Sequence, residues 1–167
     1  PYMLNPDCPP AVNKIEHYKK KFGLSTERLT QMTQRMKSVG EEEGIHFSYG
    51  GDLGNSFDAH RLVWLGQQQG KEDATMNALF AAYFEQEKNP ADHSVLLAAG
   101  ATAGLTGVQE MLSSSQGASE VKGELATKAR GVSGVPHFIV DDTYEISGAQ
   151  EAPVFVQLFK RLAATRP

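Results

Sequence analysis

Residues 131–140 read Gly-Val-Ser-Gly-Val-Pro-His-Phe-Ile-Val, and they carry the strongest fold signal in the 167-residue chain. The glycines and the proline mark an approach segment, and residues 137–140 are a predicted strand. Asp141-Asp142-Thr143 predicts a tight turn into a second strand over residues 144–146. An amphipathic helix follows over residues 152–163. Because a bare two-stranded hairpin is only marginally stable in water, we expect this helix to pack on it.

Upstream of residue 131 the sequence pattern is mostly helical. Glycines, prolines and capping residues separate the apolar stripes of six or so helices between residues 22 and 130. Thr106 with Gln109 three residues later predicts a capping box. Residues 45–49 alternate apolar and polar side chains, which fits a brief strand or an extended segment. Residues 1–4 are a short extended stub that begins in mid-strand. The residues therefore indicate an α/β sheet whose N-terminal part is absent.

Composition and charge exclude several classes of protein. The chain has 40% hydrophobic and 22% charged residues, which is ordinary for a folded domain. Its formal net charge of −4 argues against a nucleic-acid-binding face. No apolar run approaches the roughly 20 residues of a membrane helix, so no membrane partner is expected. The histidines show no metal-ligand spacing, so we expect no metal site.

Several stretches of the sequence resemble the DsbA family of thioredoxin-fold proteins, and in particular its FrnE-like branch. The stretch at 131–140 is similar to the family's cis-proline segment. Four further stretches follow the family in the same order along the chain: Tyr2-Met3-Leu4-Asn5-Pro6-Asp7, Asn55-Ser56-Phe57-Asp58-Ala59-His60-Arg61-Leu62, Leu79-Phe80-Ala81-Ala82-Tyr83-Phe84 and Ile146-Ser147-Gly148-Ala149-Gln150.

The resemblance implies an α/β, thioredoxin-like fold, N-terminally incomplete here, with a large inserted α-helical domain. Residues 1–22 and 131–167 would form the thioredoxin-like part, and residues 23–130 the helical insertion. The FrnE-like features also imply a cytoplasmic location. A sheet without its first strand and helix would expose an apolar edge, so we expect a route to a homodimer there.

The resemblance also implies an N-terminal strand and a helix opening with Cys-Pro-x-Cys, which would precede Pro1. Thiol–disulfide exchange needs a thiolate with a lowered pKa and a second thiol. The chain has one cysteine, Cys8, so we expect no catalytic residue within it. Asp7 beside Cys8 disfavours a thiolate, which predicts an incidental loop thiol, with a redox-sensitive Cys8 as the alternative. The protein is a disulfide oxidoreductase if a Cys-x-x-Cys segment lies upstream of Pro1.

Val135 and Pro136 are the expected substrate-binding residues. Taken alone, Pro136 fits the opening of an edge strand, where proline is tolerated. The resemblance instead implies a cis Val135–Pro136 bond, with the Val135 main chain pairing with a bound substrate like an added strand. It also makes His137 a candidate modulator of a nearby thiol, with packing or surface exposure as the alternative.

Ala149 and Gln150 are further candidate substrate-binding residues, in the loop that opens the last helix. Free N–H groups at such a position suit a carboxylate. In the related kappa-class transferases and hydroxychromene carboxylate isomerases this loop holds glutathione. The resemblance therefore leaves glutathione open as a substrate or co-substrate and implies no other cofactor. Gln150 stands where that branch commonly has aspartate, which weighs against glutathione.

Three functions follow from these observations. The first is a DsbA/FrnE-like thiol–disulfide oxidoreductase family protein, acting on protein or small-molecule thiols and disulfides and inactive as this chain. The second is a glutathione-dependent isomerase or transferase of the same superfamily. The third is a non-catalytic protein that binds a peptide or partner subunit. A Ser56–His60–Asp58 triad is disfavoured, and His60 with Arg61 is better explained as a structural pair bonding backbone carbonyls.

Overall fold

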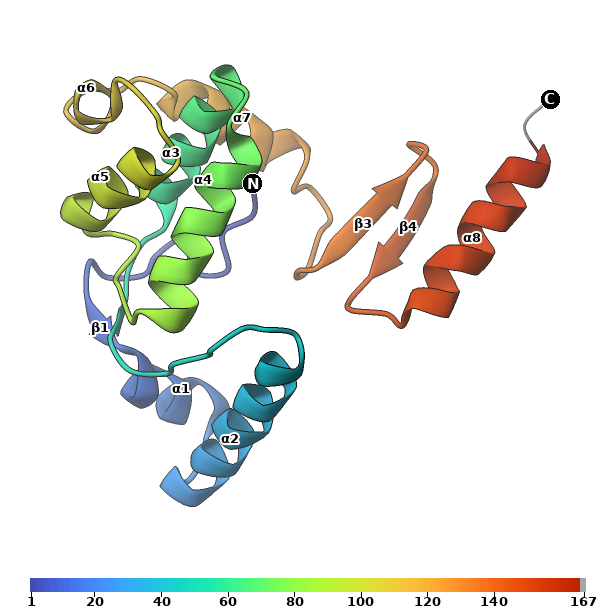
Figure 1. Ribbon diagram of the computed structural model, residues 1–167, viewed down its shortest axis with the longest axis horizontal. Helices are drawn as coiled ribbons and strands as arrows, with labels where there is room; N and C mark the ends of the chain where they lie inside the picture. The colour runs from blue at the N-terminus through green and yellow to red at the C-terminus, as the bar shows by residue number, and fades with distance from the viewer. Residues whose placement is uncertain (166–167) are drawn as a thin grey trace. The chain divides into compact units, whose positions relative to one another are not determined.

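The computed structural model describes residues 1–165, which form two compact units (Figure 1). Pro1 and Met3–Lys128 make up the first, called here the helical unit. Tyr2 and the residues from Ala129 onward make up the second, called here the hairpin unit. The predicted start of the C-terminal part, at residue 131, lies two residues from this division. The grouping of residues 1–22 with 131–167 in one thioredoxin-like part stays a prediction.

The helical unit contains seven helices and one short sheet within the described residues. Its helices are α1 (Lys14–Phe22), α2 (Thr26–Glu42), α3 (Phe57–Gln68), α4 (Glu72–Phe80), α5 (His93–Thr102), α6 (Val108–Leu112) and α7 (Ala118–Thr127). A π-helical turn over Ala81–Glu85 continues α4. Strand β1 (Val12–Asn13) pairs antiparallel with β2 (Asp52–Leu53). This small sheet ties the start of α1 to the segment that leads into α3.

The core of the helical unit lies among α3, α4, α5 and α6. Leu62, Leu96 and Met111 are fully buried there. Gly100 on α5 lies against Val108 so closely that a Cβ atom would come within 2.7 Å of the valine side chain. Glycine therefore allows α5 and α6 to approach. This core fixes α3, which carries the Asn55–Leu62 signature at its N-terminal end.

The structure shows one local prediction in the helical unit to be wrong and decides between the two alternatives of another. The capping box at Thr106 is wrong, because α6 begins after Gly107 and Thr106 is bound elsewhere. Its N–H group donates to Gln69 Oε1 at 3.1 Å, and its C=O group accepts from Gln69 Nε2 at 3.0 Å. Residues 45–49 form an extended segment rather than a strand. The Ser48 N–H group donates to the Phe84 carbonyl in the π-helical turn that continues α4.

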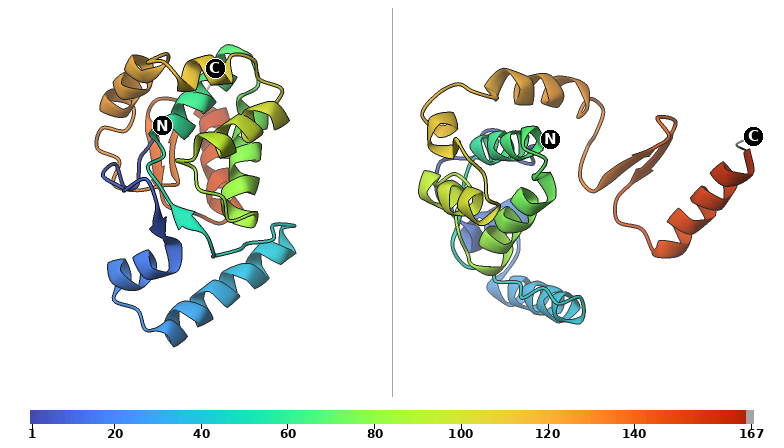
Figure 2. Two further views of the ribbon diagram at one scale, coloured as in Figure 1. Left: turned by 90° about the vertical axis from the view of Figure 1, so that its left-hand side faces the viewer. Right: turned by 45° about the horizontal axis from the view of Figure 1, so that its top comes forward.

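The hairpin unit has the predicted order of strand, turn, strand and helix. Strands β3 (His137–Val140) and β4 (Tyr144–Ser147) pair antiparallel, with His137 opposite Ser147. Asp141 and Asp142 both have positive φ, the geometry of a tight hairpin turn. Helix α8 (Ala152–Thr165) packs on the strands, and the Phe155 ring meets Phe138 edge-on with centroids 4.9 Å apart. Figure 2 shows this unit from two further directions.

Residues 1–4 lie outside both two-stranded sheets of the described structure. The sequence-based expectation of a stub in mid-strand is therefore not what the structure shows for this segment. Instead, the turn that follows it is tied to the helical unit through Asn55, whose Nδ2 donates to the Pro6 carbonyl at 2.7 Å. None of the helices within residues 1–165 has both the length and the apolar character needed to cross a membrane.

Candidate functional site

The main chain just before β3 is exposed and has unpaired hydrogen-bonding groups. The peptide bond between Val135 and Pro136 is cis, and 52% of the Val135 surface is exposed. Neither the N–H nor the C=O group of Val135 has a hydrogen-bond partner among residues 1–165. β3 pairs with β4 along one side only within the hairpin unit. An unpaired donor and acceptor next to a strand edge are the groups that an extended peptide uses to add a strand.

The loop before α8 lies beside this open main chain. The Gly148 N–H group donates to the Pro136 carbonyl at 2.8 Å, and Gly148 adopts a positive φ of 80° that favours glycine. The structure thus brings the Val135–Pro136 pair and the Ala149–Gln150 pair together in one unit. Gln150 Nε2 donates to the Ser147 carbonyl at 3.4 Å, so this side chain is turned toward β4.

The His137 side chain contacts residues of β4 across the hairpin. Its Nδ1 lies 3.0 Å from Ser147 Oγ, and its Nε2 lies 3.7 Å from a carboxylate oxygen of Glu145. Both ring nitrogens therefore face β4 side chains, which fits the packing alternative. Its role as a modulator of a thiol stays a prediction.

Arg61 on α3 joins the signature segment to the turn that follows α6. Its Nε donates to the Gln116 carbonyl at 2.9 Å, and its Nη2 donates to the carbonyls of Met111 and Ser114. Arg61 is 5% exposed, and the Ser114 and Gln116 carbonyls lie just beyond the C-terminal end of α6, where backbone acceptors lack helical partners. The interpretation of Arg61 as a structural residue bonding backbone carbonyls is confirmed.

Asp58 completes this network in a way that the sequence did not reveal. Its Oδ1 accepts from Arg61 Nη1 at 2.8 Å, and its Oδ2 lies 2.9 Å from His93 Nε2 on α5. Burial opposes ionisation of Asp58, but hydrogen bonds from Arg61 and His93 and their charges outweigh it and hold its pKa below the usual value. The Asp58 carboxylate therefore links α3 to α5.

Replacing Asp58 with asparagine is expected to lower the free energy of unfolding by about 1–2 kcal/mol at pH 7. Because the pKa of Asp58 is lowered in the folded state, its carboxylate stabilises the fold above the unfolded-state pKa. That contribution is lost as the pH falls through the folded-state pKa. Urea unfolding of both proteins from pH 7 to pH 3 checks this, and a difference that stays constant over this range would contradict it.

The comparisons with known proteins agree with the arrangement of these elements. The sequence profile of the family described as DSBA-like thioredoxin domain matches residues 4–160. The chain belongs to this family. A crystal structure of a probable DsbA oxidoreductase from Streptomyces coelicolor is similar to it, with a TM-score of 0.89 and 26% sequence identity over 99% of this chain and 74% of that one. No curated protein matches the chain.

The predicted fold class is thereby confirmed: the chain has a DsbA-like thioredoxin fold with a helical insertion. Two of the stretches that carry the family resemblance also meet in space. Asn55 donates to Pro6 in the turn after residue 4, and its Oδ1 accepts from the Phe57 N–H group at 2.9 Å. Asn55 thus fixes the first turn of α3 against the start of the chain.

This DsbA-family chain holds its one cysteine inside the helical unit. Cys8 lies in a turn closed by a hydrogen bond from its N–H group to the Asn5 carbonyl, and it is 8% exposed. Lys14 is buried in the same unit beside the half-buried Tyr83: Lys14 Nζ donates to the Tyr83 carbonyl at 3.3 Å and lies 4.1 Å from the centre of the Tyr83 ring. Burial lowers the pKa of Lys14, although the charge of Glu87 opposes this.

We expect Cys8 to react with a thiol reagent such as Ellman's reagent at least about tenfold more slowly in the folded protein than in urea, because access limits the rate. Stopped-flow absorbance under both conditions measures the two rates. Equal rates would instead support the alternative of a redox-sensitive thiol.

A shallow cavity of about 490 Å³ opens beside the signature segment, lined by Pro10, Asn55, Phe57, Asp58, Ala91 and Lys122. The polar groups of Asn55 and Asp58 in its wall are already used in the hydrogen bonds described above. Within residues 1–165, no cluster of three or more histidine, cysteine, aspartate or glutamate side chains is arranged to hold a metal ion.

Proposed function

We propose that this chain carries the substrate-binding strand of a DsbA-like thiol–disulfide oxidoreductase and has no dithiol activity by itself. The observation that supports it best is the unpaired main chain of Val135 at the start of β3. Membership of the DsbA-like family supports the choice of thiols and disulfides as the substrate class. In this proposal Val135 and Pro136 contact the substrate main chain, and Ala149 with Gln150 flank it.

The chemistry of thiol–disulfide exchange explains why this chain can bind the substrate without carrying out the reaction. A thiolate attacks one sulfur of a disulfide, forms a mixed disulfide and releases the other sulfur as a thiolate. A second thiol must then attack the mixed disulfide to release the product. These 167 residues contain one cysteine, and that thiol is buried. The chain therefore supplies recognition of the substrate, whereas the dithiol has to come from outside these residues.

We further propose that the chain belongs to the FrnE-like branch and lies in the cytoplasm. The Asn55–Leu62 signature supports this proposal. The structure gives this signature a definite role: Asn55 holds the turn at Pro6, and Arg61 holds the segment after α6. Its residues shape the helical unit around the first turn of α3. Substrate contact is assigned to the hairpin unit alone.

Binding of a short unstructured peptide tests the proposal. Its cysteine is S-methylated so that no exchange takes place. We expect Val135→Ala, which keeps the N–H group, to bind the peptide nearly as well as the unaltered chain. Val135→Pro removes that N–H group and is expected to weaken binding up to about tenfold, the value of one main-chain hydrogen bond. Isothermal titration calorimetry measures both.

The same titration separates the proposal from the glutathione-dependent alternative. Glutathione binding that is unaffected by Val135→Pro, without any peptide binding, would favour a glutathione-dependent enzyme that uses the Ala149–Gln150 loop. Equal peptide affinities for Val135→Ala and Val135→Pro would contradict main-chain recognition at this position.

A further inference from the structure

Helix α2 carries an apolar stripe that the helical unit leaves uncovered. Met32, Met36 and Val39 are 41%, 40% and 47% exposed, and their spacing places them on one side of the helix. The adjacent side of α2 is the one that packs inward, through the buried residues Leu29 and Gly40. Figures 1 and 2 show α2 at the margin of the helical unit.

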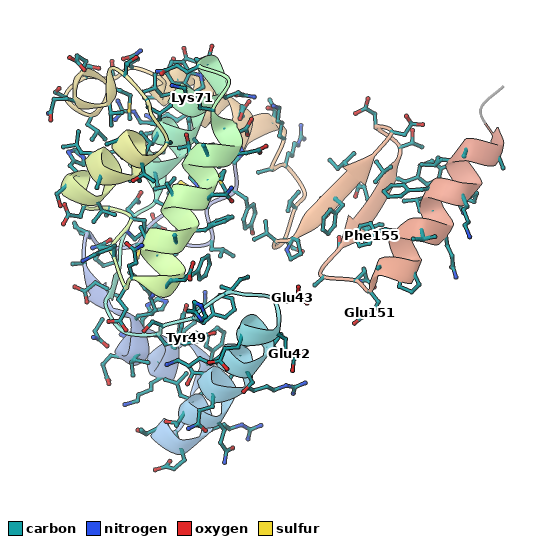
Figure 3. The ribbon with its side chains drawn as sticks, viewed as in Figure 1. Glu42, Glu43, Tyr49, Lys71, Glu151 and Phe155 are labelled. Atoms are coloured by element: carbon teal, nitrogen blue, oxygen red, sulfur yellow. The ribbon has the colours of Figure 1, made fainter. Side chains whose placement is uncertain are left out.

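The two ends of this stripe carry opposite charges. Arg28 precedes Met32 by four residues, and Glu43 follows Val39 by four, so both continue the same side of the helix. Both are exposed, and neither side chain has an ion-pair or hydrogen-bond partner among the residues that the structure describes. Figure 3 labels Glu42 and Glu43 at the C-terminal end of α2.

Neighbouring residues strengthen this polarity. Lys19, Lys20 and Lys21 form the last turn of α1, and only three residues separate the end of α1 from the start of α2. Glu41 and Glu42 lie in the last turn of α2 itself. One end of the stripe is therefore mainly basic, although Glu27 also lies in the first turn of α2, and the other end is acidic, with methionines between them.

The order of residues along the stripe is self-complementary. Met32 and Met36 lie symmetrically about position 34, the middle of the helix Thr26–Glu42. When two copies of α2 run antiparallel, Met32 of one copy meets Met36 of the other, and Arg28 comes within about one turn of Glu43. The same contact occurs twice, as an isologous twofold interface requires.

We propose that α2 is a homodimer interface, formed by antiparallel pairing of its Met32–Met36–Val39 stripe with that of a second copy. Burial of the methionines and valine supplies the attraction, since flexible methionines fill irregular contacts well. The Arg28–Glu43 pairs set the direction of the helices, because a parallel arrangement would place like charges together. A helix of 17 residues is about 26 Å long, so we expect a modest interface and a dissociation constant on the order of micromolar.

Sedimentation equilibrium of the full chain between about 1 and 200 µM tests the existence of the dimer. Met36→Lys is expected to weaken it at least about tenfold, because it puts two lysines at the centre of the interface. The matched control is Gln34→Lys, which adds the same charge to the opposite side of α2 and is expected to leave the dissociation constant unchanged. Both positions are exposed, so neither substitution disturbs the core.

Charge reversal tests the antiparallel direction. Arg28→Glu alone and Glu43→Arg alone each place like charges together twice and are expected to weaken the dimer about tenfold. A mixture of the two variants is expected to recover a heterodimer, because each interface contact then joins opposite charges. The double variant recovers the homodimer for the same reason.

Three results would overturn the proposal. A monomer at about 200 µM shows that α2 does not pair. A dimer that withstands Met36→Lys lies elsewhere, for example at the open edge of β3. A dimer that is weakened by Met36→Lys but indifferent to both charge reversals uses the stripe without the antiparallel register.

Discussion

Replacing Arg61 with alanine is expected to lower the free energy of unfolding by about 3–5 kcal/mol. The guanidinium group binds three backbone carbonyls and Asp58 while it is 5% exposed. Its removal leaves the carbonyls of Ser114 and Gln116 without their donor and leaves the partly buried carboxylate of Asp58 without its main partner. Urea unfolding followed by the helical circular dichroism signal measures the change.

Two further substitutions show whether the geometry of Arg61 matters. Arg61→Lys keeps the charge, but a single ammonium group cannot reproduce the planar fork that spans several acceptors, so it is expected to recover only part of the loss. Arg35→Ala on α2 removes an exposed arginine and is expected to change the stability by less than about 0.5 kcal/mol. A loss below about 1 kcal/mol for Arg61→Ala would contradict the structural role given to this residue.

In an insulin-reduction assay, this chain is expected to show no turnover above the rate of the reductant alone. Catalysis by a thioredoxin-fold protein cycles between a dithiol and an intramolecular disulfide, and one cysteine cannot form that disulfide. The buried position of Cys8 also limits exchange through mixed disulfides. The precipitation of reduced insulin chains, followed by turbidity, provides the measurement.

A thioredoxin serves as the positive control in this assay, and Cys8→Ser is the matched variant. The unaltered chain and Cys8→Ser are expected to give the same background rate. Turnover comparable to the thioredoxin control, or turnover that disappears with Cys8→Ser, would show that this chain reacts by itself.

The hairpin unit was predictable because its signals are local. Residues 131–140 and the Asp141-Asp142 turn specify a strand, a tight turn and a second strand within a few residues of each other. The helices that follow apolar periodicity were predictable for the same reason. The DsbA family could be predicted because several stretches match in order along the whole chain, which single motifs do not provide.

The contacts that shape the site come from residues far apart in sequence, and no local pattern reveals them. His93 lies 35 residues from Asp58, and the Met111 carbonyl lies 50 residues from Arg61. The failure of the Thr106 capping box has the same cause, since Gln69 binds Thr106 across 37 residues. A local rule assumes that nearby groups are the best partners, and here a distant side chain takes their place.

The burial of Lys14 could not be predicted from the local sequence either. A lysine in the first turn of a helix with three further lysines suggests a solvated position, yet Lys14 is 2% exposed. Tyr83, which covers it, lies 69 residues away. The contact of Lys14 with Tyr83 in the π-helical turn joins two segments that no local pattern connects.

The most direct test of the substrate-binding strand follows the amide signal of Val135 by nuclear magnetic resonance in an isotopically labelled chain. We predict that the S-methylated peptide shifts this signal in a saturable way and slows its hydrogen exchange, with smaller changes at Gly134 and His137. Saturable binding of the peptide that leaves the Val135 amide unshifted and freely exchanging would contradict it.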